Sequence, residues 1–93
     1  MSILALIKMN NEIGAVGHPI TTVLTYNQSG IFATTKEPIG PSGQATICGR
    51  DIGTGSIYVL WYDGSRNGFV VAAVIIGSAP VSNARVTVHY VAK

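Results

Sequence analysis

The chain has 93 residues, a single cysteine and a formal net charge of +2. This length suits one small domain over residues 1–93. Cys48 alone cannot form an intrachain disulfide. The six basic residues are dispersed and do not make a nucleic-acid-binding patch. Charged residues make up 11 % of the chain and apolar residues 47 %, so part of the surface has to be uncharged or apolar.

Strand patterns alternate with turn residues along the whole chain. We expect strands over residues 2–9, 20–26, 31–36, 44–48, 56–62, 69–76 and 81–91. Loops rich in glycine, proline, asparagine and serine separate them, and no stretch has a convincing helical period. Turn signals every 8–12 residues or so are typical of antiparallel sandwiches and barrels. We therefore predict an all-β fold, an antiparallel β-sandwich of about seven strands that is immunoglobulin-like or jelly-roll-like.

The strongest strand signal covers residues 56–62. Alternation along this strand places two apolar sets on opposite faces: Ile57, Val59 and Trp61 on one, and Tyr58, Leu60 and Tyr62 on the other. A turn over residues 63–68 leads into a second apolar run at 69–76. Because both faces are apolar, we expect the 56–62 strand to be central in the sheet.

The last strand has a cleaner alternation. Val86, Val88 and Tyr90 are expected to face the core, and Arg85, Thr87 and His89 to face solvent. The second set is either an ordinary solvated face or a polar partner surface.

Three segments carry a resemblance to a known architecture: Gly17-His18-Pro19-Ile20, Gly40-Pro41-Ser42-Gly43-Gln44-Ala45-Thr46-Ile47 and Thr54-Gly55-Ser56-Ile57-Tyr58-Val59. Over residues 17–64 the chain resembles bacterial immunoglobulin-like and transthyretin-like sandwich modules. The chain departs from that pattern where two further apolar strands follow. The resemblance implies a spacer, adhesive or decorating domain on a surface or virion, and not an enzyme.

One set of residues is a candidate ligand site. Saccharide sites combine an aromatic face with planar polar side chains, and the strand end and loop at 58–67 supply both, with Tyr58, Trp61, Tyr62, Asp63, Arg66 and Asn67. The favoured interpretation is that the aromatics belong to the core or a subunit interface and that the loop is only a turn. The alternative is a small carbohydrate-binding lectin that uses these residues.

Catalytic and metal-binding patterns are weak. Cys48 could pair on paper with His18 or His89 and a carboxylate, but it lies mid-strand, where a small residue packed in a sheet is the simpler interpretation. The four carboxylates all lie in or beside predicted turns, where solvation explains them. No candidate ligands have metal-site spacing. We expect no enzyme activity, no cofactor and no metal.

These patterns favour a non-catalytic structural or interaction module, an oligomeric β-domain of a virion, phage tail or surface appendage. The strands at 2–9, 56–62 and 69–76 are apolar on both faces, which predicts a homo-oligomer unless loops 10–17 and 37–43 cover the second face. A glycan or another surface protein is the other partner we expect. No signal peptide or membrane-inserting segment is recognised, so cytoplasmic synthesis is expected, followed by virion or cell-surface assembly.

Overall fold

A computed structural model describes residues 17–39 and 46–93, which form one antiparallel sheet. Its six strands are β1 (His18–Thr25), β2 (Phe32–Ala33), β3 (Thr46–Asp51), β4 (Ile57–Asp63), β5 (Gly68–Ile76) and β6 (Arg85–Ala92). Their order across the sheet is β1-β6-β3-β4-β5-β2. The all-β antiparallel prediction is confirmed for these residues. The strand expected to be central, β4, lies between β3 and β5.

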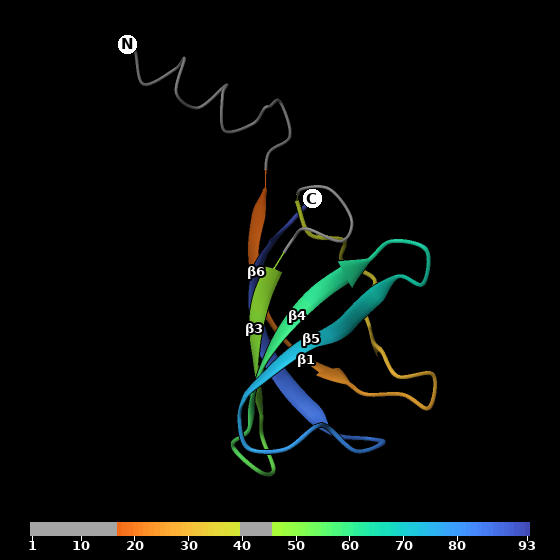
Figure 1. The fold of residues 1–93 in the computed structure, drawn as a ribbon. Coiled ribbons are helices and arrows are strands. Elements are labelled where there is room, and N and C mark those ends of the chain that lie inside the picture. The colour runs from red at the N-terminus through yellow and green to blue at the C-terminus, as the bar shows by residue number, and fades with distance from the viewer. Residues whose placement is uncertain (1–16, 40–45) are drawn as a thin grey trace.

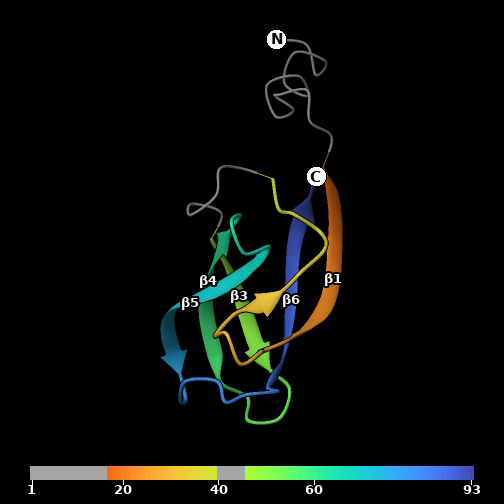
Figure 2. The same ribbon diagram turned by 90° about the vertical axis from the view of Figure 1, so that its right-hand side faces the viewer.

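The sheet curls around a single core, as Figures 1 and 2 show. Its two ends approach each other, because Tyr26, just after β1, forms a bridge with Phe32 of β2. The described strands thus make one curled layer and not two facing sheets. Alternation along a strand shows which face is buried, but it does not show whether the opposing face belongs to a second sheet. The strand expected at 2–9 lies outside the described residues.

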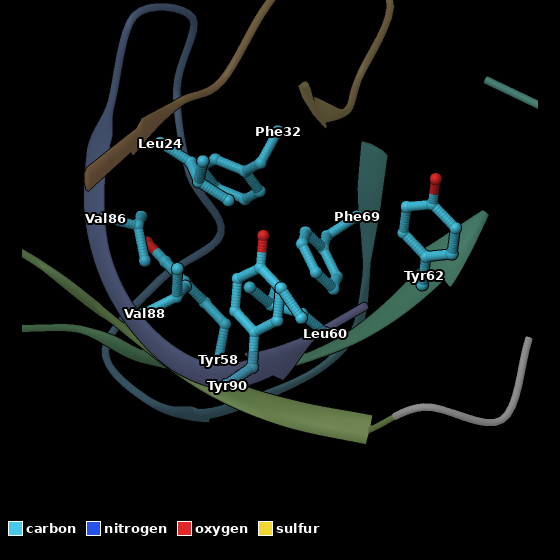
Figure 3. Packing of buried hydrophobic residues seen from close by; sticks show 10 residues of the cluster. Leu24, Phe32, Tyr58, Leu60, Tyr62, Phe69, Val86, Val88 and Tyr90 are labelled. Carbon is cyan, nitrogen blue, oxygen red and sulfur yellow. The ribbon is translucent and has the colours of Figure 1, made fainter. Parts of the chain in front are cut away.

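Side chains on the concave side of the sheet form the core (Figure 3). Its buried members are Leu24, Phe32, Tyr58, Leu60, Tyr62, Phe69, Val86, Val88, Tyr90 and Ala92. The predicted alternation of β4 and β6 is confirmed, since each strand contributes every second residue to this cluster. The ring of Phe69 lies edge-on to Tyr62 and Tyr90, with centroids 5.4 and 5.2 Å away. Each such side chain contributes roughly 1.5–3 kcal/mol through burial.

The strand expected at 31–36 is reduced to Phe32–Ala33. The backbone amide of Lys36 donates to Thr34 Oγ1 at 3.1 Å, and such local side-chain bonds compete with strand pairing. The following segment runs from β2 to the end of β6 (Figure 2). There the Ile39 amide donates to the Val91 carbonyl, and the Lys93 amide to the Glu37 carbonyl. The described part of the 37–43 loop therefore lies along β6.

Two other strand boundaries differ from the prediction. The strand expected at 81–91 begins at Arg85, because Asn83 has a φ of 72° and the Ala84 amide donates to the Val81 carbonyl, which makes a turn. The strand expected to end at Cys48 continues to Asp51. Gly49 permits this continuation, since a Cβ at this position would lie 2.5 Å from Val86 Cγ1.

Candidate interaction surface

The outer side of the β4–β5 hairpin is apolar. Ile57, Val59 and Trp61 of β4 alternate with the buried set, and antiparallel pairing puts Ile76, Ala73 and Val70 of β5 opposite them. Residues that pair across an antiparallel ladder share a face. We call these residues the outer patch: Ile57, Val59, Trp61, Val70, Ala73 and Ile76. Trp61 is 47 % exposed and Ile76 is 56 % exposed, so an isolated chain presents this surface to water.

Strand β5 contains two β-bulges where it pairs with β4. The register shifts between Ile57 and Tyr58 and again between Val59 and Leu60, which leaves Ile75 and Ala72 as extra residues on β5. Each bulge bends the strand and increases its twist. The bulged Ile75 is 59 % exposed, and the neighbouring Val74 is 39 % exposed. The C-terminal end of β5 therefore exposes apolar side chains beside the outer patch.

The outer side of β6 and β3 is polar. The predicted partner residues Arg85, Thr87 and His89 lie together on this face, and Thr87 pairs with Arg50 of β3. The Nδ1 atom of His89 is 2.8 Å from the hydroxyl of Thr21 on β1. An open hollow of about 420 Å³ lies between the polar face and the outer patch, lined by residues that include Arg50, Thr87 and Ile57. Cys48 also lines this hollow.

The aromatic residues expected to bind a saccharide are separated by the sheet. Tyr58 and Tyr62 point into the core and are 1 % and 4 % exposed, whereas Trp61 points outward. Burial raises the pKa of both tyrosines above the ordinary value. Tyr58 and Tyr62 therefore present no ring face to solvent, and the six predicted residues do not form one surface.

The polar residues of the predicted saccharide site, Asp63, Arg66 and Asn67, lie at the end of β4 and in the β4–β5 turn. Ser65 Oγ donates to Asp63 Oδ1 at 2.6 Å, and Arg66 Nε lies 3.0 Å from Asp63 Oδ2. The hydrogen bonds from Ser65 and then Arg66 hold the pKa of Asp63 below its ordinary value. Arg66 also donates to the carbonyl oxygen of Ser29 at 3.4 Å. These contacts fix the turn that carries Arg66 and Asn67.

Arg66 and Asn67 line an open hollow of about 470 Å³. Its other polar walls come from Thr22 of β1 and from Thr34, Thr35 and Lys36, which follow β2. The lining contains two cations and no carboxylate. The sequence does not indicate these partners, because the order of the strands, which brings β1 and β2 together, has no local signal in the chain.

One carboxylate is buried, contrary to the solvated positions expected for all four. Asp51 is 5 % exposed at the end of β3, and its Oδ1 accepts from the amides of Gly53 at 2.8 Å and Thr54 at 3.1 Å. The hydroxyl of Tyr58 donates to Oδ2 at 3.3 Å. Burial on its own would raise the pKa of Asp51, but the hydrogen bonds from Thr54, Gly53 and Tyr58 outweigh it and leave the pKa lowered. Asp51 caps the β3–β4 turn.

Other candidates for chemistry are dispersed. Within residues 17–39 and 46–93, no three side chains of the histidine, cysteine or carboxylate type gather as metal ligands. Cys48 lies mid-strand as expected, but its side chain is exposed and not packed in the sheet. No helix of the described chain is long and apolar enough to cross a membrane.

No family model, curated protein or solved structure matches this chain. The resemblance to immunoglobulin-like and transthyretin-like modules therefore stays a prediction.

Proposed function

We propose that this protein is a non-catalytic structural or interaction domain that assembles with copies of itself. The observation that carries the proposal is the outer patch, an apolar surface of the β4–β5 hairpin with Trp61 and Ile76 about half exposed. An exposed Trp61 alone presents about 100 Å² of indole surface, since aromatic side chains bury roughly 150–250 Å² when covered. Contiguous apolar patches larger than a few hundred Å² usually mark interaction sites.

The distribution of charge supports the same function. No charged residue occurs between Arg66 and Arg85, the stretch that includes all of β5. The charged side chains of this outer face lie at the border of the patch or beyond it: Arg50 pairs with Ile57, Asp63 ends β4 two residues after Trp61, and Arg85 is farther away on β6. A virion, phage tail or surface appendage is the setting we propose, because such assemblies bury many small uncharged surfaces between subunits.

Sedimentation equilibrium at micromolar concentrations tests the proposal. We expect the average mass to rise with concentration above the monomer value of 9.7 kDa. Trp61 is the only tryptophan, so its emission should shift to the blue over the same concentration range as water leaves the indole. The variant Trp61→Thr should associate at least tenfold more weakly, which corresponds to about 1.4 kcal/mol. A monomer mass at all concentrations would refute self-association.

A small lectin is the second candidate function, and the hollow beside Arg66 supports it. The donors of Arg66, Asn67, Lys36 and three threonines surround about 470 Å³, which suits the hydroxyls and an acidic group of a saccharide. A glycan array followed by titration calorimetry tests this function. We expect Arg66→Gln to abolish binding to any glycan found, whereas Arg85→Gln, a cation outside the hollow, should leave it unchanged.

A further inference from the structure

Within the described residues, the outer edge of β5 is paired only at the start of the strand. One side of this strand pairs with β4 from end to end, but β2 covers the other side only at Gly68 and Phe69. No described segment pairs with that side over residues 70–76, which we call the free edge. A strand edge presents backbone N–H and C=O groups that are ready to pair with another chain.

The free edge lacks most of the features by which proteins protect such edges. Charged side chains and prolines normally interrupt an exposed edge strand, yet residues 70–76 contain neither. The side chains here are apolar, and Ile75 and Ile76 are 59 % and 56 % exposed. The two bulges are the remaining protection. They twist β5, so a partner can form only a short ladder, and apolar contacts have to supply most of the affinity.

We propose that the free edge of β5 pairs antiparallel with the free edge of a second copy. This inference rests on the proposed function, since it names the interface through which the domain assembles. An antiparallel pair of identical strands has a two-fold axis, so where residue i of one copy pairs with residue j of the other, j also pairs with i, and the same contacts form twice. Two uncharged edges also meet without repulsion between like charges.

The size of the surface sets the expected affinity. Stable interfaces bury about 800 Å² on each partner. Val74, Ile75 and Ile76 at the free edge are 39 %, 59 % and 56 % exposed, and three such side chains cover less than roughly 800 Å². The outer patch continues this strip on the same hairpin. An interface at the small end of the range gives weak and reversible association. We therefore expect a dimer that forms in the micromolar range.

Two matched variants distinguish pairing at the free edge from nonspecific hydrophobic association. Ile75→Lys places a charge on the free edge at an already exposed position. Val23→Lys makes the same change on the outer face of β1, the strand at the opposite end of the sheet order, where the valine is 38 % exposed. We expect sedimentation equilibrium to show at least tenfold weaker dimerisation for Ile75→Lys, and less than a threefold change for Val23→Lys. Circular dichroism checks that both variants keep the wild-type fold.

Hydrogen exchange of the wild-type protein supplies a test that needs no variant. Pairing at the edge should protect backbone amides within residues 70–76, and this protection should increase with protein concentration along with the dimer. A different result is possible: Trp61→Thr weakens association, Ile75→Lys does not, and the amides of residues 70–76 gain no protection. This result would mean that the outer patches of two copies stack face to face. The edge inference would then be wrong and the proposed function would stand. A monomeric wild type would overturn both, and protection that is independent of concentration would show that the edge is already occupied.

Discussion

Replacing Asp51 by alanine removes the acceptor for two backbone amides and for the hydroxyl of Tyr58. A hydrogen bond to a charged group contributes about 1.5–3 kcal/mol. Gly53 and Thr54 are exposed, so water can partly replace the lost acceptor at their amides, and the Tyr58 hydroxyl still reaches the Ser78 carbonyl at 3.0 Å. We therefore expect a loss of about 2–3 kcal/mol in the free energy of unfolding.

Urea denaturation followed by circular dichroism measures this loss. For a domain of this size the slope is about 1 kcal/mol per molar urea, so the midpoint of Asp51→Ala should fall by about 2–3 M. The variant Asp51→Asn keeps one acceptor oxygen and the shape of the side chain, and should lose only about 1 kcal/mol. An alanine variant within 0.5 kcal/mol of wild type would refute the role assigned to this side chain.

The pH dependence gives an independent check. The pKa of Asp51 is lowered in the folded protein, so the unfolded chain takes up the proton first as the pH falls. The stabilisation is complete well above the ordinary pKa of 3.8 and is lost as the pH drops through the folded value. The stability gap between wild type and Asp51→Asn should therefore narrow from pH 7 to pH 3. A gap that stays constant or widens would contradict the lowered pKa.

Three further predictions concern other positions. Gly49→Ala should lose about 1–3 kcal/mol, because the added Cβ would lie 2.5 Å from Val86 Cγ1 in the core, whereas Gly53→Ala should stay within about 0.5 kcal/mol in the same urea assay. The exposed Cys48 should react with a thiol reagent in the folded protein, and reaction only after unfolding would contradict its placement. Burial raises the pKa of Tyr58, so the folded state keeps this proton longer than the unfolded chain, and urea midpoints should fall as the pH rises above about 10.

The strands of this fold follow from local pattern. Period-two alternation identifies β4 and β6 together with the buried face of each, because every second side chain in them is apolar and packs into the core. The boundaries that differ depend on interactions between side chain and backbone. Thr34 Oγ1 accepts from the Lys36 amide and ends β2 early, and the turn at Asn83 delays β6. Composition does not reveal such bonds.

The candidate sites were harder to predict because they depend on strand order. Trp61 and Tyr62 are adjacent in sequence, yet adjacent residues of a strand point to opposite faces. Tyr62 therefore lies in the core and Trp61 on the surface. The hollow at Arg66 needs Lys36 from the segment after β2 and Thr22 from β1, at the other end of the strand order. Nothing local in either stretch indicates that β2 and the β4–β5 turn are neighbours.

The curl of the sheet explains why the second apolar face is left exposed. A single curled sheet has one concave side, and the ten buried residues of the core cluster occupy it. The outer residues of β4 and β5 therefore cannot contact that core, and the polar strands β1 and β6 lie at the opposite end of the sheet order. Solubility alone would favour charges at these positions, yet the whole stretch between Arg66 and Arg85 has none. An apolar surface without charge, along a strand whose edge pairs with no described segment beyond Phe69, supports the proposed contact with another copy of the chain.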